Sequence, residues 1–308
     1  MPVYNGGPYL ARAIDSVLAQ AFSDFEFIIV NDGSTDDTES VIRSYADPRI
    51  RLITQPNHGL VFSLNRGIQL AKGVYIARMD ADDISAPKRL STQLALLESR
   101  PSIGVVGTAI IRIDESGRPL RTEYFLANDA ELRQDLALRC PFAHGSVMMR
   151  RDLVQQVGGY RQEFWLAEDY DLWRRMAAVG ELANSLEPLY FYREHSHGVT
   201  ANNQSRMAEV AGRISRELLD RDCLKNDIPL SRVVASYWNI AEAPRVAAVS
   251  KILENYCRVM LDAARRGRIV LATVRFAKIL LGGRTSIEFA AKKIAKRVRA
   301  VAITNEPA

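Results

Sequence analysis

Several features that mark other protein classes are missing from this chain of 308 residues. Its three cysteines, Cys140, Cys223 and Cys257, form no Cys-x-x-Cys pair, which argues against a disulfide framework and a thiolate zinc site and indicates a reducing compartment. The N-terminus shows no basic region followed by an apolar one, so the sequence predicts no signal peptide. No apolar run approaches the roughly 20 residues that a membrane span needs. We therefore expect a cytoplasmic protein, soluble or peripheral to a membrane.

The charge is distributed unevenly along the chain. Residues 201–308 carry 20 of the 41 Lys and Arg and 10 of the 36 Asp and Glu, so residues 1–200 carry 21 against 26. An acidic body with a basic tail predicts two regions with different partners. We place them at residues 1–202 and at a mainly helical region, residues 203–308. Aromatic residues are sparse in the basic region, so we expect no nucleic-acid binding.

The end of the basic region has the pattern of an amphipathic helix. Ile287, Ala291, Ile294, Val298 and Val301 recur at helical spacing, and lysines and arginines occupy much of the remaining surface. Such a helix can lie on an anionic membrane, which would place the protein at the inner face of the plasma membrane. The alternative is a surface helix that packs its apolar stripe on the main domain.

The first half of the chain alternates apolar segments of strand length with amphipathic helical segments. The expected strands are 26–30, 50–53, 74–79 and 102–113, and the expected helices are 36–45, 60–71 and 87–99. This alternation predicts an α/β fold with a mostly parallel central sheet and helices on both faces. In such sheets ligands bind beyond the carboxyl ends of the strands. Asp32 and Asp80 both follow strand ends, so we expect them in one crevice.

Three carboxylates follow the strand that ends at Met79. Asp80 and Asp82 are two residues apart, so on extended backbone they point to the same side. Like charges that close together are unfavourable unless a cation lies between them, and a divalent cation held there can bind a diphosphate. The alternative is a solvated acidic turn that caps the next helix.

Five segments in order resemble the family 2 inverting glycosyltransferases with a GT-A (Rossmann-like) fold. The resemblance runs from Met1 to about Thr200, and the segments are Met1–Gly7, Val30–Ser34, Leu64–Gly67, Arg78–Asp83 and Ala167–Trp173. It implies metal-assisted hexosyl or N-acetylhexosaminyl transfer from a UDP- or dTDP-sugar to a hydroxyl of a glycan or a lipid-linked acceptor. We therefore expect a bacterial enzyme that builds a cell-surface polysaccharide or a lipid-linked glycan.

A nucleotide-sugar donor needs a pocket for base and ribose and neutralisation of the diphosphate. Asp32 can accept a hydrogen bond from a base or ribose, although it could instead cap the following helix. The resemblance implies ribose binding by Asp80 and a metal, Mn²⁺ or Mg²⁺, on Asp82. The whole predicted donor set is Pro2, Val3, Tyr4, Asn5, Asp32, Asn65, Arg66, Asp80, Ala81 and Asp82.

The resemblance also identifies the catalytic pair. Glu168 and Asp169 begin a predicted helix about 100° apart, so only one can point at a given atom. The family pattern assigns Asp169 as the general base that deprotonates the acceptor. Glu168, also placed in the catalytic set, and Asp171 either contact the acceptor or cap the helix.

Three further side chains complete the predicted site. His195, in the segment Tyr192–His195, can complete the metal shell, with His197 as its rival and Arg193 as a phosphate contact. His144 and Trp165 can contact a sugar acceptor, Trp165 by stacking on an apolar sugar face. Core packing is the alternative role for Trp165.

Two positions depart from the family pattern. Met1 stands where a central strand should end, so either the start site is misassigned or the domain lacks most of that strand; we favour misassignment, because losing a central strand would cost much buried area. Leu64 stands where many relatives carry Arg, and Arg66 could supply the charge from a different rotation on the helix.

Other functions fit the sequence less well. A sugar-phosphate nucleotidyltransferase would share the nucleotide-binding core, but Gly6-Gly7 lacks the Arg and Lys of its glycine-rich loop. A dinucleotide-binding dehydrogenase would need a Gly-x-Gly-x-x-Gly segment after a strand, which is missing. A non-catalytic partner protein of the same fold would not need four carboxylates at Asp32, Asp80, Asp82 and Asp169.

Overall fold

The computed structural model describes residues 1–136, 139–195, 203, 205–207 and 209–214. By its internal contacts the chain divides into two compact units, Met1–Ala211 and Gly212–Ala308. The basic helix predicted near the C-terminus lies outside the described residues, so its role and the boundary expected after residue 202 stay predictions. In the part of the chain that is described, no helix is both long and apolar enough to cross a bilayer.

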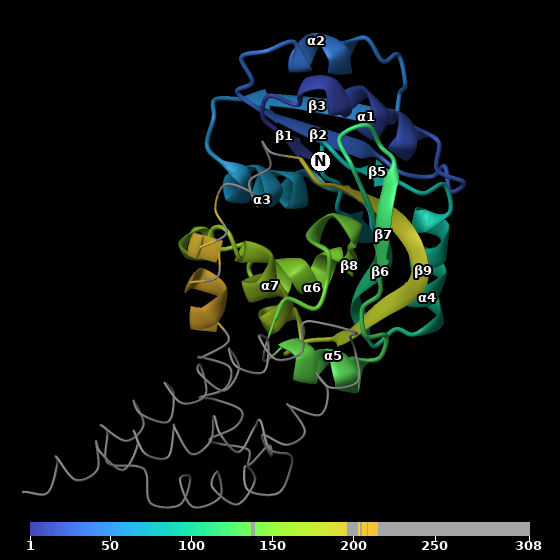
Figure 1. Cartoon of the computed structure of the whole chain (residues 1–308), viewed down its shortest axis with the longest axis vertical. Coiled ribbons are helices and arrows are strands. Elements are labelled where there is room, and N and C mark those ends of the chain that lie inside the picture. Colours follow the sequence, from blue (N-terminus) through green and yellow to red (C-terminus); the bar gives the residue numbers. More distant parts are fainter. Residues whose placement is uncertain (137–138, 196–202, 204, 208, 215–308) are drawn as a thin grey trace, which may run out of the picture. The chain divides into compact units, whose positions relative to one another are not determined.

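The N-terminal part of the first unit contains a parallel three-stranded sheet (Figure 1). Its strands are β1 (Pro2–Val3), β2 (Phe27–Asp32) and β3 (Ile50–Gln55), hydrogen-bonded in the order β1-β2-β3. Every residue of β2 is buried, which explains why this segment reads as a continuous apolar run. The helices α1 (Leu10–Leu18) and α2 (Thr38–Arg43) alternate with these strands, as expected from the sequence.

A second, mixed sheet contains the other six strands of the described residues. Its order is β4 (Tyr75–Ala77), β8 (Met148–Arg150), β6 (Ile103–Ile113), β9 (Glu181–Arg193) and β5 (Ile84–Ser85), and β7 (Pro119–Glu123) also pairs with β6. β6 and β9 run parallel, whereas the other pairs in this sheet are antiparallel. The expected parallel arrangement therefore holds for the first sheet and for β6–β9. The short connection from β6 to β7 forces an antiparallel pair.

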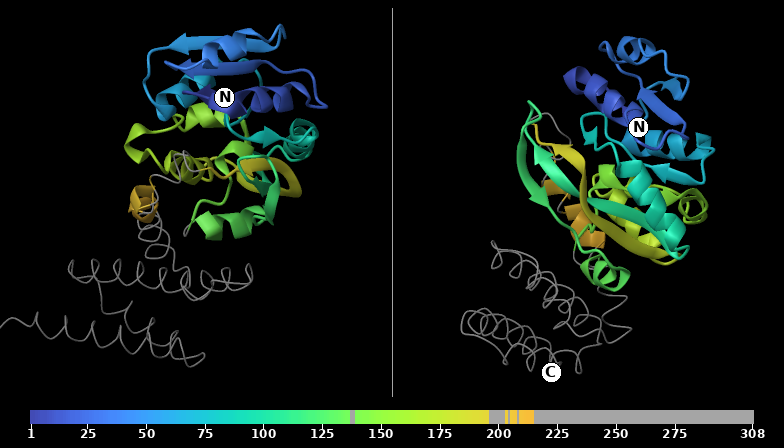
Figure 2. Two further views of the ribbon diagram at one scale, coloured as in Figure 1. Left: turned by 45° about the horizontal axis from the view of Figure 1, so that its top comes forward. Right: turned by 90° about the vertical axis from the view of Figure 1, so that its right-hand side faces the viewer.

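Helices pack against both sheets, so the expected α/β architecture with a Rossmann-like N-terminal part is confirmed (Figure 2). Val106 of β6 belongs to the same core cluster as Leu97 of α4, and Ile29 of β2 packs in the core cluster that contains Ile14 of α1. The remaining helices are α3 (Leu60–Leu70), α4 (Arg89–Ser99), α5 (Asp129–Leu136), α6 (Arg151–Gln156) and α7 (Glu168–Met176), with short 3₁₀ turns η1 (Gly7–Tyr9), η2 (His144–Ser146) and η3 (Gln162–Phe164).

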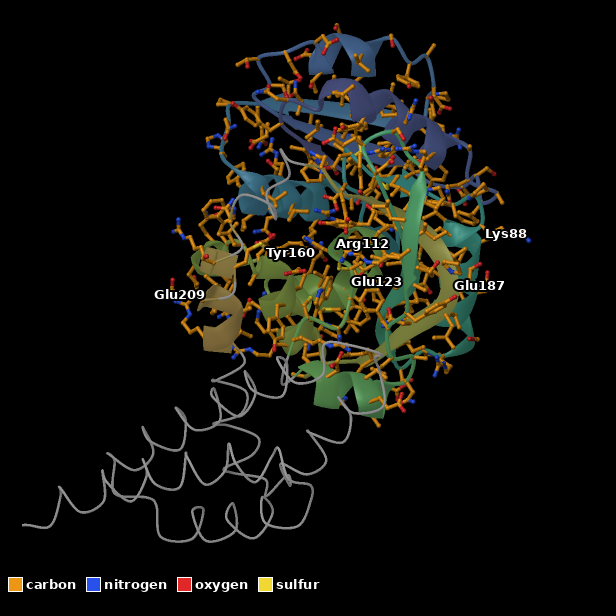
Figure 3. The ribbon with its side chains drawn as sticks, viewed as in Figure 1. Lys88, Arg112, Glu123, Tyr160, Glu187 and Glu209 are labelled. Atoms are coloured by element: carbon orange, nitrogen blue, oxygen red, sulfur yellow. The ribbon has the colours of Figure 1, made fainter. Side chains whose placement is uncertain are left out.

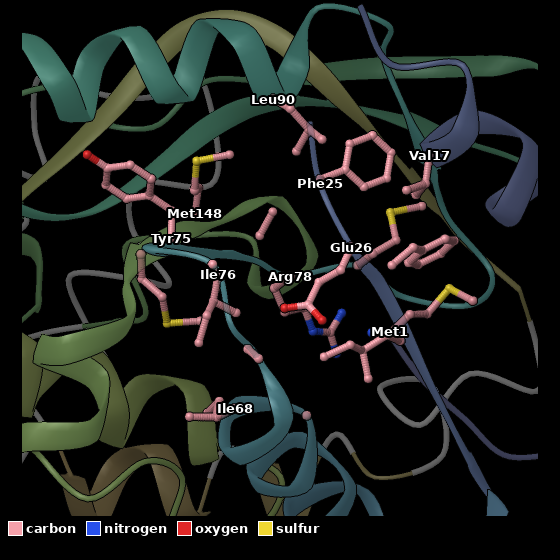
Figure 4. A pocket seen from close by; sticks show the side chains of 18 of the residues that line it. Met1, Val17, Phe25, Glu26, Ile68, Tyr75, Ile76, Arg78, Leu90 and Met148 are labelled. Atoms are coloured by element: carbon pink, nitrogen blue, oxygen red, sulfur yellow. Dashed lines mark hydrogen bonds between the residues drawn. The ribbon is translucent and has the colours of Figure 1, made fainter. Parts of the chain in front are cut away.

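A cavity of about 910 Å³ is lined by strands of both sheets (Figure 4). Ile28 of β2 and Ile76 of β4 contribute to its wall, together with residues of α3 and α4. The amino group of Met1 lies here and donates a hydrogen bond of 2.9 Å to the carbonyl oxygen of Ile28. Residues of β1, β2 and β4 therefore share one cavity wall.

Candidate active site

The three carboxylates after β4 lie in three different environments. The Arg78 guanidinium contacts Asp80 Oδ2, and the backbone N–H of Asp80 donates to the Tyr190 hydroxyl at 3.2 Å. Asp83 is buried and accepts a hydrogen bond of 2.7 Å from the backbone N–H of Arg193. Burial and the neighbouring charge of Asp82 raise the pKa of Asp83. Asp83 thus attaches the acidic turn to β9.

Asp82 and His195 form a pair although 113 residues separate them. His195 Nε2 lies 2.9 Å from Asp82 Oδ2, and 38% of the Asp82 side chain is exposed. The hydrogen bond to Asp82 raises the pKa of His195, although burial acts in the opposite direction. The ring of Tyr9 lies 5.3 Å from the imidazole and limits its movement. The rival ligand His197 lies outside the described residues.

The Asp82 carboxylate suits Mg²⁺ or Mn²⁺, and the imidazole nitrogen of His195 suits a transition metal such as Mn²⁺ better than Mg²⁺. Among the described residues no group of three or more His, Cys, Asp or Glu side chains is arranged to hold an ion. A cation here would therefore have Asp82 and His195 as protein ligands and would need further oxygen ligands. Mg²⁺ commonly takes one or two carboxylates from the protein and completes its shell with substrate phosphates and water.

Asp32 is almost completely enclosed by the loop that follows β3. Its Oδ1 accepts hydrogen bonds from Gln55 Nε2 (2.8 Å) and from the backbone N–H of His58 (3.0 Å), and its Oδ2 accepts one from the backbone N–H of Gly59 (2.8 Å). The side chain does not cap α2, whose capping residue is Asp37. Asp32 therefore organises the loop, and donor binding by this residue stays a prediction.

The segment after β1 lies beside the end of β2. Asn5 has a left-handed backbone with φ of 50°, its N–H donates to Ser34 Oγ at 2.9 Å, and its Oδ1 accepts the Thr35 N–H at 2.8 Å. Tyr4 is exposed, with 53% of its surface accessible. The structure thus brings together the predicted donor segments Pro2–Asn5 and Val30–Ser34.

Asn65 braces α3 against the loop that precedes α7. Asn65 Nδ2 donates to the Tyr160 carbonyl oxygen, and the Tyr160 N–H donates to Asn65 Oδ1, both at 2.8 Å. Tyr160 is labelled in Figure 3. Arg66 follows Asn65 on the exposed side of α3. The structure therefore gives Asn65 a scaffolding role that sequence reasoning missed, while the donor roles of both residues stay predictions.

Glu168 and Asp169 begin α7, as predicted. Leu166, two residues earlier, has a φ of 80°, a strained value that turns the chain sharply before the helix. Glu168 is 5% exposed, and its Oε2 accepts the Leu166 N–H at 2.8 Å. Burial and the charge of Asp169 raise the pKa of Glu168 to about 7. Beside the predicted base Asp169 there is therefore a second carboxyl group, Glu168, whose pKa is higher than that of an ordinary Glu.

Asp169 is partly buried next to a thiol. Its Oδ2 accepts a hydrogen bond of 3.4 Å from Cys140 Sγ, and its Oδ1 accepts the Tyr170 N–H at 2.7 Å. Burial raises the pKa of Asp169, and these hydrogen bonds oppose that rise. Cys140 is a contact that sequence reasoning missed, because nothing in its spacing distinguishes it from a core cysteine.

His144 lies inside a buried network rather than on an open surface. Its Nε2 is 2.8 Å from the Tyr160 hydroxyl, and its Nδ1 is 4.0 Å from Glu168 Oε1. Burial and the charge of Arg78 lower its pKa well below the usual value, so the imidazole is neutral. The network links η2 to the start of α7.

The other aromatic and charged candidates have protein partners. The guanidinium of Arg206 lies 5.3 Å from the Trp165 ring centre, so one face of this partly exposed indole is covered. Asp171 is fully buried and ion-paired with Arg161 and Arg175. This pairing replaces the acceptor contact or helix cap expected for Asp171. Contacts of His144 and Trp165 with an acceptor stay predictions.

Arg193 ties the acidic turn to the β6–β7 loop. Its Nε donates to the Asp82 carbonyl oxygen at 2.7 Å, and its Nη1 donates to the carbonyl oxygens of Asp114 and Glu115 at 3.0 Å each. It is 3% exposed. These backbone contacts give Arg193 a structural role where a phosphate contact was expected.

Known proteins resemble this chain in sequence and in fold. The model of glycosyl transferase family 2 matches residues 1–158. The putative glycosyltransferase EpsE of Bacillus subtilis is 39% identical over 64% of this chain and 72% of its own length, and the O-antigen biosynthesis glycosyltransferase WbnJ of Escherichia coli is 32% identical over 73% and 90%. The structure of S. aureus TarS residues 1–349 in complex with UDP-GlcNAc superposes with a TM-score of 0.59 at 18% identity, over 87% of this chain and 86% of that one.

Proposed function

The chain belongs to glycosyl transferase family 2 and is a glycosyltransferase, and on this premise we propose that it transfers a hexosyl or N-acetylhexosaminyl group, with inversion, from a UDP- or dTDP-sugar to a hydroxyl of a glycan or lipid-linked acceptor. The observation that carries the proposal is the pairing of Asp82 with His195 in the same unit as the carboxylates that open α7. In this proposal Asp82 and His195 serve the diphosphate of the donor, and the carboxylates that open α7 serve the acceptor.

In this mechanism Asp169 is the general base. Its carboxylate takes the proton of the acceptor hydroxyl while that oxygen attacks C1 of the sugar from the face opposite the diphosphate. The bond from C1 to the diphosphate oxygen breaks as the new glycosidic bond forms, so the anomeric centre inverts. General-base catalysis of this kind contributes about 10²- to 10⁴-fold to the rate.

Asp82 and His195 would hold Mg²⁺ or Mn²⁺. A divalent cation there would neutralise the negative charge that grows on the nucleoside diphosphate as it leaves. The chain's own contribution is to fix the two ligands: Asp83 and Arg193 tie the acidic turn to β9, and Tyr9 packs on the imidazole of His195.

The donor nucleotide would lie between the segment Pro2–Asn5 and the loop after β3. Asn5 is hydrogen-bonded to the loop after β2, and the loop after β3 donates two backbone hydrogen bonds to Asp32. These hydrogen bonds hold the wall of the proposed donor pocket in place before a ligand binds. The UDP-GlcNAc complex of TarS supports a uridine nucleotide. The name of WbnJ supports an acceptor that is part of a cell-surface polysaccharide.

A screen of nucleotide-sugars tests the proposal by following nucleoside diphosphate release with and without Mg²⁺ or Mn²⁺. We expect sugar-dependent release that EDTA abolishes. Asp169→Asn should lower kcat by about 10²- to 10⁴-fold, and Asp82→Ala should abolish the metal dependence. Asp152→Asn, an exposed Asp at the start of α6, is the matched control and should keep full activity. Release of pyrophosphate from a nucleoside triphosphate would instead identify a nucleotidyltransferase.

A further inference from the structure

The imidazole of His144 is held in one orientation by two aromatic rings. His144 lies in η2, and 15% of its side chain is exposed. Its ring centre is 5.4 Å from that of Tyr160, at an interplanar angle of 53°, and 6.1 Å from that of Trp173, at 75°. Both aromatic side chains are buried. Because these rings pack in the core, the two ring nitrogens of His144 point in fixed directions.

Tyr160 binds one of these nitrogens and is itself braced. Its hydroxyl lies 2.8 Å from His144 Nε2. Its backbone N–H and carbonyl oxygen are both hydrogen-bonded to the side chain of Asn65 on α3. Burial raises the pKa of the Tyr160 hydroxyl, so the hydroxyl keeps its proton and can donate it to His144.

The second ring nitrogen faces the carboxylate of Glu168. His144 Nδ1 lies 4.0 Å from Glu168 Oε1, while Glu168 Oε2 accepts the Leu166 N–H at 2.8 Å. Hydrogen bonds in active sites are often this long before the substrates bind, and they shorten in the Michaelis complex. One oxygen of Glu168 is therefore bound to the backbone, and the other points toward the imidazole.

The charge of Glu168 selects the tautomer of His144. Burial lowers the pKa of His144, so the imidazole is neutral and has one N–H group and one nitrogen lone pair. A lone pair on Nδ1 would face the Glu168 carboxylate and be repelled by it, whereas an N–H group there is attracted. The Tyr160 hydroxyl can then donate to the lone pair on Nε2. Both contacts are favourable only when the proton is on Nδ1.

We propose that His144 is a positioning residue for Glu168: its Nδ1–H group, with Tyr160 donating to Nε2, orients the Glu168 carboxylate to accept a hydrogen bond from an acceptor hydroxyl beside Asp169. This role differs from the direct acceptor contact that the sequence predicted for His144. The inference rests on the proposed function, because it takes the carboxylates that open α7 as the acceptor side of the site.

Nuclear magnetic resonance of the full chain labelled with ¹⁵N-histidine identifies the tautomer directly. The chain has four histidines, and the signals lost in His144→Gln assign His144. At pH 8, above the Glu168 pKa of about 7, we expect a protonated Nδ1 and an unprotonated Nε2. Glu168→Gln removes the charge and should increase the ratio of the Nε2–H to the Nδ1–H tautomer about fivefold, the net value of one hydrogen bond. A protonated Nε2 in the wild type overturns the proposal, as does an unchanged ratio in Glu168→Gln.

His144→Asn and His144→Gln separate the two ring nitrogens. The Asn amide can place an N–H group near the position of Nδ1, whereas the Gln amide reaches the position of Nε2. His144→Gln should therefore raise the pKa of Glu168 by about half a unit, a roughly threefold change in proton affinity. His144→Asn should keep the wild-type value. The other charges acting on Glu168, those of Asp169 and Arg78, are the same in both variants.

The titration is followed in protein labelled with ¹³C-carboxyl glutamate, and the signal lost in Glu168→Gln assigns Glu168. His58→Gln, which alters an exposed histidine in the loop after β3, is the matched control and should leave the Glu168 pKa unchanged. Equal shifts in His144→Asn and His144→Gln, or no shift in either, overturn the proposal. Neither measurement uses a donor or an acceptor, so undiminished turnover in Asp169→Asn would refute the proposed base and leave these results standing.

Discussion

Glu168→Gln should change how the stability of the protein depends on pH. Glu168 has a pKa of about 7 in the folded protein, against 4.5 for an ordinary Glu. Between these values the folded state binds more protons than the unfolded state, so stability falls as the pH rises. The stabilisation is complete below pH 4.5 and is lost as the pH passes through 7. The shift corresponds to about 3 kcal/mol.

The glutamine variant removes this titration but keeps an oxygen that can accept the Leu166 N–H. We expect the free energy of unfolding of the wild type to fall by about 3 kcal/mol more than that of the variant between pH 4.5 and pH 8. Titrating groups that do not interact with Glu168, such as Asp83, are common to both proteins and cancel in the difference. Urea titrations followed by tryptophan fluorescence at four pH values would measure it. Glu98→Gln, an exposed site on α4, should run parallel to the wild type. A constant difference between wild type and Glu168→Gln at every pH would refute the reasoning.

Three further substitutions have definite expected outcomes. Asp171→Ala removes a fully buried carboxylate from its ion pairs with the partly buried Arg161 and Arg175 and should destabilise the protein by about 3 kcal/mol in urea unfolding; an unchanged midpoint would contradict this. Gly145→Ala would place a Cβ against the hydroxyl of the buried Tyr190 and 2.6 Å from Asp80 Oδ2, so both side chains must shift and a raised donor KM is expected; an unaltered KM would show that the turn can yield. His195→Ala should weaken Mn²⁺ binding in calorimetric titrations in the presence of nucleoside diphosphate, whereas equal affinity would exclude His195 as a ligand.

The local order of strands and helices could be predicted from the sequence. The buried run ending at Asp32 showed where β2 stops, because a strand covered on both faces is continuously apolar. The expected strand 74–79 is shorter in the structure, where the partly buried β4 ends at Ala77. The ordered motifs also identified the family. Asp82 and His195 were expected to act together from this resemblance, and the structure places them in contact.

Long-range contacts could not be predicted in the same way. The pairing of β6 with β9 makes the second sheet mixed, and no local periodicity encodes which distant strand lies next to another. The two hydrogen bonds between Asn65 and Tyr160 join residues 95 positions apart and depend on how segments meet in space. The elevated pKa of Glu168 has the same origin, because burial is a property of the fold and not of the residue.

The attachment of the acidic turn to the end of β9 determines how late during synthesis the candidate site is completed. Asp83 accepts a hydrogen bond from the Arg193 N–H across 110 residues, and Asp82 contacts His195 across 113 residues. Contacts of such sequence separation form late, because the intervening chain must first be ordered. A nascent chain can therefore complete the parallel sheet that ends with β3 long before the Asp82–His195 contact exists. The cation proposed for this pair could not be held by both residues until residue 195 has left the ribosome.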